Sequence, residues 1–493
     1  MKFKSLRKWK NKEELEGLLF FAQRLDELLF DFTLDTYKPS ALNAPFLCLE
    51  ALTLIAEIEG EVIDRNNLKH VLEELEWSLK KDLVVKRLID LDISDYILLG
   101  ETDSLQNVKI RLELLFNRIE PSKYLYKTFD LIFESIEDVK KKDINFLAGT
   151  LITTLINQGY HQTYLHNTVE DFFFYGDEET IDSKLDLHKL FIHFRLEKKQ
   201  YEVAFRVSSL IKEISDSCEA FDLKILDVKP ETYKTEFKLH RDDVYVVSAD
   251  VITYDPYKAR EEVERRLEKV KNLYVLFHHK KGINWNEEAF ILCKTAQREF
   301  LIKRPLGPMK KGFDLKAEKA AIELNRFIKN FGLASSSFVK FDRVVDFHGS
   351  AIANEIVEYQ LINLWTSLET IIPANSTKSK IANIVDSLMP FLILTYTKKL
   401  ILRFTSDLMN WNSAIVKSVL RKIPDSKGLA LPERVLMLLQ VVENKSYSSA
   451  IRFSAIFLRQ FAAVARGFLA LFALFQLNML LVQPHWRPFP SFK

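Results

Sequence analysis

The spacing of apolar residues in the first third of the chain constrains the fold most strongly. Between residues 12 and 156, apolar side chains recur three and four positions apart, as in Leu15, Leu18, Leu19, Ala22 and Leu25. This spacing puts them on one face of an α-helix. Glycine is scarce here, and Pro39, Pro45 and Pro121 fall where helices would break. The sequence therefore predicts an α-helical N-terminal domain over residues 1–165.

The apolar period changes from about residue 166 to residue 312. Residues 190–196 and 201–207 alternate between apolar and polar side chains around a short polar segment, which is typical of a β-hairpin. Further strands are predicted at residues 237–239, 244–247, 273–277 and 289–292, with a charge-rich helix over residues 255–272. This middle segment is predicted to be a mixed α/β domain, residues 166–312.

Helical spacing returns after residue 313. Ala317, Ala320, Ala321, Leu324, Phe327 and Ile328 share one helical face. Pro373 and the polar residues 375–377 mark the end of one helix and the N-cap of the next. We expect a helical domain over residues 313–443, so the fold class is a mainly α-helical α+β multidomain protein.

Length, charge and cysteine usage bound the function. A chain of 493 residues is too long for one hydrophobic core. The net charge of +2 gives no global field for a polyanion, so a nucleic-acid contact would be local. Cys48, Cys218 and Cys293 are odd in number and far apart, which argues against a disulfide framework. The basic start has no apolar core of a signal peptide, so a cytoplasmic location is predicted.

The last segment, residues 444–493, is hydrophobic and contains no acidic residue. Arg452, Arg459 and Arg466 are seven residues apart and could form a basic helical face for an anionic surface. The alternative is a buried helix whose arginines reach the surface. The apolar stretch 467–482 is shorter than the roughly 20 residues needed to span a bilayer, so a membrane partner is not predicted.

A ten-residue string in the C-terminal helical domain resembles a known family. Residues 360–369 read Gln-Leu-Ile-Asn-Leu-Trp-Thr-Ser-Leu-Glu, and residues 347–353 read Phe-His-Gly-Ser-Ala-Ile-Ala. Together they resemble the signature helix of the Apea-like HEPN domains and the helix before it, over residues 341–387. The resemblance implies a helical bundle of prokaryotic anti-phage defence proteins, many of which are metal-independent ribonucleases. It also implies a terminal Arg-x4-His motif, which is missing or altered after Arg421.

In the family, the histidine of this motif acts as acid and base on an RNA 2′-hydroxyl, the arginine holds the phosphate, and dimerisation pairs two sites. Two strings have the required spacing, Arg343 to His348 and Arg65 to His70. The alternatives are a hydrogen-bonded structural histidine at 348 and helix capping by the asparagines after Arg65.

Glu369 is the third candidate catalytic residue, beside Arg343 and His348. It lies four residues after Trp365, on the same helical face as an indole expected to be mostly buried. Such a carboxylate could orient a catalytic arginine or histidine, or form a structural ion pair.

No metal and no cofactor is predicted. His278 and His279 would point to opposite sides of a strand, and His161 and His166 have no carboxylate cluster near them in the sequence. The chain contains neither a phosphate-binding glycine loop nor a dinucleotide fingerprint.

The resemblance implies an anti-phage defence protein with a HEPN-like ribonuclease effector that acts on RNA as a homodimer, and the preceding domains are expected to be sensor or partner-binding modules. Because the terminal motif is missing or altered, an inactive copy is left open. One alternative is a non-catalytic scaffold for RNA binding, protein binding or dimerisation. A second is membrane association through the hydrophobic tail.

Overall fold

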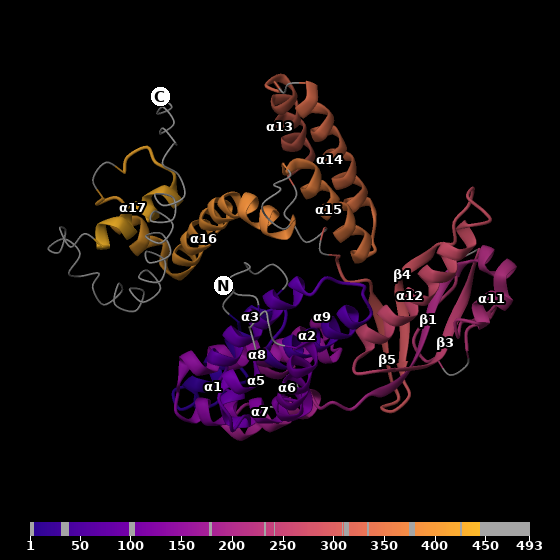
Figure 1. The fold of residues 1–493 in the computed structure, drawn as a ribbon, viewed down its shortest axis with the longest axis horizontal. Coiled ribbons are helices and arrows are strands. Elements are labelled where there is room, and N and C mark those ends of the chain that lie inside the picture. Colours follow the sequence, from indigo (N-terminus) through magenta and orange to yellow (C-terminus); the bar gives the residue numbers. More distant parts are fainter. Residues whose placement is uncertain are drawn as a thin grey trace. The chain divides into compact units, whose positions relative to one another are not determined.

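The computed structural model of the chain describes residues 4–30, 39–97, 104–176, 180–230, 233–240, 242–307, 309, 315–332, 335–373, 380–423 and 426–443. It is mainly helical with one five-stranded sheet in the middle, as predicted (Figure 1). The chain divides into two compact units. The large unit contains residues 2–332 and 351–360, and the C-terminal unit contains the other described residues after 332.

Nine α-helices open the large unit, within the described residues up to 170. They are α1 (Glu16–Leu29), α2 (Ala44–Glu59), α3 (Asn66–Lys81), α4 (Val85–Leu88), α5 (Ile93–Tyr96), α6 (Leu105–Arg118), α7 (Pro121–Glu137), α8 (Lys141–Gln158) and α9 (Gln162–Glu170). Pro45 and Pro121 lie in the first turns of α2 and α7, where a proline needs no backbone N–H. Gly159 ends α8 with a φ of 111°, a left-handed conformation that glycine adopts without strain.

One hydrophobic core gathers these helices and the segment after them, from Trp9 to Phe194. That segment contains a π-helix (Asp171–Tyr175), a 3-10 turn (Lys184–Asp186) and α10 (Leu187–His193). The indole N–H of Trp9 donates to the carbonyl of Phe173, with 2.8 Å between the heavy atoms. Residues 166–194 therefore pack with the N-terminal helices.

The predicted hairpin over residues 190–207 is wrong in its first arm, because α10 occupies residues 187–193. Ser183 and Asp186 form a reciprocal capping box that starts the helical turn. Leu187, Leu190, Phe191 and Phe194 are buried, and their spacing of three and four residues is that of one helical face.

The sheet is antiparallel, with strands in the order β2-β3-β1-β4-β5. Its strands are β1 (Lys199–Ser208), β2 (Lys224–Leu226), β3 (Asp243–Thr253), β4 (Trp285–Cys293) and β5 (Arg298–Lys303). The strands predicted at residues 201–207, 244–247 and 289–292 are confirmed. Those at 237–239 and 273–277 are wrong: the first is irregular, and the second lies at the end of α12 (Pro256–Val275) and in the turn after it.

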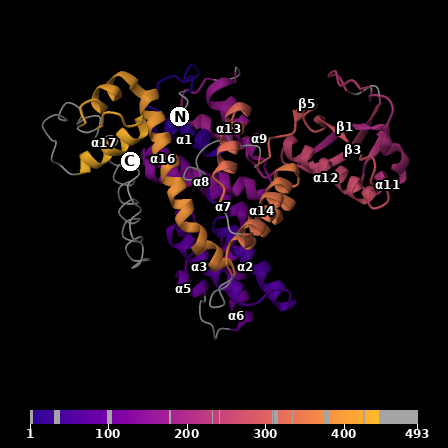
Figure 2. The same ribbon diagram turned by 90° about the horizontal axis from the view of Figure 1, so that it is seen from above.

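Helix α12 covers one face of this sheet (Figure 2). Alternate residues of β1 point toward it, and they pack with one face of the helix; the two sets are Tyr201, Val203, Phe205 and Val207, and Ala259, Val263, Leu267 and Val270. Ala204, Tyr233, Phe237, Tyr245, Val247 and Phe290 form a smaller cluster on the other face. Two short elements, a 3-10 helix (Ser209–Ile214) and α11 (Ser215–Glu219), join β1 to β2.

Helices α13 (Ala317–Lys329), α14 (Ser335–Ala353), α15 (Val357–Ile371), α16 (Lys380–Leu420) and α17 (Leu431–Glu443) confirm the predicted return to helix. Among the described residues, a buried cluster of the C-terminal unit joins α16 and α17 through Leu408, Val416, Leu420, Ile423, Val435 and Leu438. Asn412 interrupts α16 with a φ of −159°, and its Oδ1 accepts from the N–H of Ile415 to restart the helix.

Helices α13, α14 and α15 leave many apolar side chains exposed, including Ile322, Phe327, Phe338, Val345, Leu361 and Ile362. No helix of the described residues combines the length and apolar content required to cross a bilayer. The hydrophobic tail, residues 444–493, lies outside the described residues.

Candidate functional site

Arg343 and His348 both lie on α14, and both side chains are exposed. An ideal α-helix turns by about 100° per residue, so two positions five apart point about 140° away from each other. Neither residue forms a hydrogen bond or ion pair with another described residue. The hydrogen-bonded structural histidine at position 348 therefore stays a prediction, and the two side chains do not converge within one chain.

Glu369 lies on α15 and is exposed, and Trp365 retains 37% exposure. The buried polar residues of this helix are Gln360 and Ser367. The hydroxyl of Ser367 donates to the carbonyl of Asn363 one turn earlier, at 2.8 Å. The three candidate catalytic residues therefore lie at the surface of two consecutive helices, α14 and α15. Within the described residues, no cleft brings Arg343, His348 and Glu369 together.

The second Arg-x4-His string, Arg65 to His70, lies at the start of α3. Asp64 caps this helix, because its Oδ1 accepts from the N–H of Asn66 at 2.9 Å. A helix start at this place is confirmed, but the capping side chain is the aspartate and neither asparagine. His70 is exposed and lies 3.9 Å from a carboxylate oxygen of Glu73.

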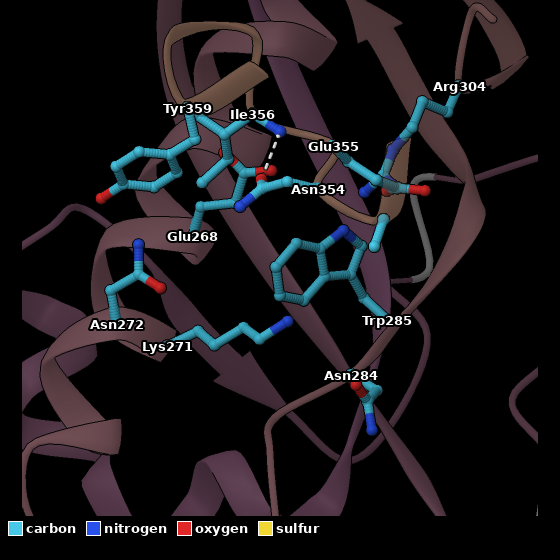
Figure 3. A pocket seen from close by; sticks show the side chains of 11 residues that line it. Glu268, Lys271, Asn272, Asn284, Trp285, Arg304, Asn354, Glu355, Ile356 and Tyr359 are labelled. Carbon is cyan, nitrogen blue, oxygen red and sulfur yellow. Dashed lines mark hydrogen bonds and ion pairs between the residues drawn. The ribbon is translucent and has the colours of Figure 1, made fainter. Parts of the chain in front are cut away.

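A polar pocket of about 480 Å³ lies in the large unit, beside α12 and the start of β4 (Figure 3). Its walls come from α12, from the segment 284–285, from Arg304 after β5, and from residues 353–359. In Figure 3 the side chain of Lys271 points toward the indole of Trp285, and its Nζ lies 5.3 Å from the ring centroid. The side chain of Asn354 accepts from the N–H of Ile356 at 2.9 Å and shapes the connection between α14 and α15.

A buried charge network contacts two residues of the pocket wall, Trp285 and Arg304. Arg260 is 2% exposed and donates to Glu264 at 2.6 Å and to the carbonyl of Glu287 at 2.8 Å. Glu264 also accepts from the Trp285 indole at 2.9 Å and from Arg304 Nε at 2.8 Å. Burial opposes ionisation of Glu264, but Arg260, Arg304 and the indole outweigh it and lower its pKa.

The ionic groups of the pocket already have partners. Arg304 contacts Glu264 and also forms an ion pair with Glu355. Burial and the neighbouring charge of Glu264 raise the pKa of Glu268, which favours its protonated form. The arrangement can hold a polar ligand or exchange a proton at Glu268, but its cations are engaged by carboxylates and by the indole.

His166 lies in a half-buried cluster with two carboxylates, which corrects the prediction that it has no carboxylate cluster near it. Its Nε2 lies 3.2 Å from Asp26 Oδ1, and its Nδ1 lies 3.9 Å from Glu170 Oε2, although no carboxylate cluster was expected there. The three side chains offer ligand atoms close enough together for a metal ion. The ammonium of Lys4 contacts both carboxylates and supplies the positive charge.

The remaining histidine and cysteine predictions have clear outcomes. His278 and His279 follow the end of α12 rather than lying on a strand, so the argument from opposite strand faces is wrong. Cys48, Cys218 and Cys293 are buried and form no disulfide.

Comparison of the chain with family models, curated proteins and solved structures finds no match.

Proposed function

We propose that this chain is a cytoplasmic anti-phage defence protein whose HEPN-like C-terminal helices cleave RNA as a homodimer without a metal ion. The observation that carries the proposal is the signature string of α15, next to a helix that holds Arg343 and His348. The large unit would sense infection or bind a partner, and RNA cleavage would arrest growth.

The exposure of these residues supports a site built from two chains. Arg343 and His348 diverge on one helix, so a single chain cannot place both on one phosphate. α14 and α15 also expose Phe338, Val345, Leu361 and Ile362. Exposed apolar side chains in such number favour burial against a second copy. In a dimer, the histidine of one chain would face the arginine of the other.

In this proposal the imidazole of His348 takes the proton of a ribose 2′-hydroxyl, and the 2′-oxygen attacks the adjacent phosphorus. The P–O5′ bond breaks, the 5′-oxygen leaves with a proton returned by the imidazolium or taken from water, and the other product ends in a 2′,3′-cyclic phosphate. The guanidinium of Arg343 stabilises the charge that develops on the phosphate oxygens. Glu369 would orient one of these two side chains. The test is cleavage of labelled RNA in EDTA by the wild-type chain and by His348→Ala.

A second candidate function is a non-catalytic scaffold that self-associates and holds RNA or protein. The divergence of Arg343 and His348 favours it, because a binding surface does not need both groups on one atom. Leu361→Glu would split the dimer in either case, whereas Val62→Glu, at an equally exposed apolar site in the large unit, would not. RNA binding without cleavage by the wild-type dimer would select the scaffold.

A further inference from the structure

A second pocket lies among the N-terminal helices, far in sequence from the HEPN-like string. Its volume is about 740 Å³, within the range of small-molecule sites. Residues of α1, of the segment before α2, of α3, of the start of α4 and of α8 line it. We call it the Trp77 pocket.

The lining of the Trp77 pocket is basic. It contains Arg24, Lys80, Lys81, Lys86 and Lys142, against the two acids Asp82 and Asp143. Arg24 pairs with Glu27, and Lys80 pairs with Glu76. Within the described residues, Lys81, Lys86 and Lys142 form no ion pair with a carboxylate. Three lysines around one cavity attract an anion, and phosphate groups are the usual ligands of such a cluster.

One of the two acids of the pocket, Asp82, is already used by the fold. Asp82 is buried, and its Oδ1 accepts hydrogen bonds from the N–H groups of Val84 and Val85 at 2.7 and 3.1 Å. Its Oδ2 accepts a hydrogen bond from the hydroxyl of Tyr124. These hydrogen bonds hold its carboxylate toward the backbone and the tyrosine. It therefore neutralises the lysine cluster only in part.

Trp77 supplies an aromatic wall. Its side chain is 59% exposed although it belongs to a well-packed helix, and an exposed indole of this size is uncommon. The ammonium of Lys81 lies 3.7 Å from its ring centroid. The indole offers a surface on which a base can stack, and the lysine offers a positive charge. Single nucleotides and single-stranded nucleic acids bind to this combination.

Asn43 lies buried in the wall of the pocket. The residue is 8% exposed, and its Oδ1 has no hydrogen-bond partner. The orientation of the amide is fixed, because the Thr154 hydroxyl donates to the carbonyl of Thr150 and must accept from Asn43 Nδ2 at 2.9 Å. The oxygen is enclosed by the protein, so Asn43 shapes the wall of the pocket and is not one of its ligand contacts.

We propose that the Trp77 pocket binds a nucleotide. The base stacks on Trp77, and the phosphates contact Lys81, Lys86 and Lys142. Inorganic phosphate would satisfy the lysines but not the indole. The proposal goes beyond RNA cleavage, since it assigns a small-molecule ligand to the helical domain.

The test is equilibrium dialysis of the full chain in EDTA, with ATP, tripolyphosphate and adenosine as separate probes. We expect saturable binding of ATP. Tripolyphosphate and adenosine should each bind at least about tenfold more weakly than ATP. Trp77→Ala should weaken ATP binding about tenfold, and Lys142→Gln by a similar factor. Both side chains are exposed, so neither substitution disturbs the core. Lys69→Gln, an exposed lysine of α3 outside the pocket, is the matched control and should change nothing.

Two results would overturn the proposal. The first is no saturable binding of ATP up to about 1 mM by the folded wild-type chain. The second is tripolyphosphate binding as tight as that of ATP, with no effect of Trp77→Ala, which would define a phosphate site only. Neither result depends on RNA cleavage, so the pocket and the proposed ribonuclease can fail separately.

Discussion

The carboxylate of Asp255 accepts a hydrogen bond from the backbone N–H of His161, with 2.8 Å between the nitrogen and Oδ2. Its Oδ1 caps α12 by accepting from the N–H of Lys258 at 2.9 Å. Asp255 is fully buried, and this burial raises its pKa to about 6. A single side chain therefore joins the start of α9 to the helix that covers the sheet.

Asp255 should make the stability of the large unit depend on pH. The unfolded carboxyl has a pKa near 3.8, so the folded state keeps a proton that the unfolded state has released. The contribution to the free energy of unfolding is present below about pH 4 and is lost as the pH rises through about 6. The difference between the two pKa values corresponds to about 3 kcal/mol.

Asp255→Asn isolates this contribution, because asparagine keeps a capping oxygen and cannot titrate. We expect the free energy of unfolding of the variant, relative to wild type, to rise by about 3 kcal/mol between about pH 4 and pH 8. Urea unfolding of both proteins at several pH values measures this. A difference that stays constant with pH would show that Asp255 titrates normally in the fold.

Glu264→Gln should be strongly destabilising. Glu264 is the acceptor shared by Arg260, Arg304 and Trp285, and neutralising it leaves a buried guanidinium with an incomplete partner. Losing one member of a buried ion pair costs about 3–5 kcal/mol. Urea unfolding measures the loss.

The matched control is Glu262→Gln on the same helix, whose side chain is about half exposed and whose carboxylate lies 3.8 Å from Arg266. A surface pair contributes about 0–1 kcal/mol, so this variant should unfold like wild type. Equal effects of the two substitutions would contradict the assigned role of the buried network.

The thiols should stay unreactive in the native protein. Burial raises the pKa of Cys48 to about 12 and that of Cys218 to about 11, so almost no thiolate exists at neutral pH. A thiol reagent should modify these two cysteines only after urea unfolds the chain. Rapid modification of either, located by mass spectrometry of the native protein, would show that its segment opens.

Lys4→Ala should uncover a metal site. The variant leaves Asp26, His166 and Glu170 without the ammonium that now balances their charge. We expect it to bind Zn²⁺ at least about tenfold more tightly than wild type, because a nearby cation no longer repels the ion. Competition with a coloured chelator measures the affinity.

The double variant Lys4→Ala/His166→Ala is the control for that experiment and should lose the gain, since it lacks the imidazole ligand. A gain that persists in the double variant would place the bound zinc elsewhere.

Apolar periodicity was enough to predict most of the fold. It located the N-terminal helices, three of the strands and the charge-rich α12. It failed where a short apolar run fits both the helical and the strand period, as at Leu190 and Phe191. It also failed where apolar residues at the end of a helix are exposed to solvent. Phe277, which follows α12, is 90% exposed, and only the packing of α12 on the sheet distinguishes this end from a strand.

The sites were less predictable than the fold. Glu170 lies four residues after His166, so helical spacing could have joined them, but Asp26 lies 140 positions before His166. The pocket beside α12 combines residues from Glu268 to Tyr359, and none of them forms a local motif. Long-range packing brings these side chains together, and a sequence pattern with a fixed spacing does not record it.

Cleavage of labelled RNA in EDTA tests the proposed function most directly, with wild type, His348→Ala and His70→Ala compared at equal dimer concentration. His70 is the exposed histidine of the other Arg-x4-His string, so its variant is the matched control. We predict cleavage by wild type and by His70→Ala, and a loss of about 100-fold or more in His348→Ala. Intact RNA with the folded wild-type dimer, or equal cleavage by all three proteins, would contradict a HEPN-like ribonuclease.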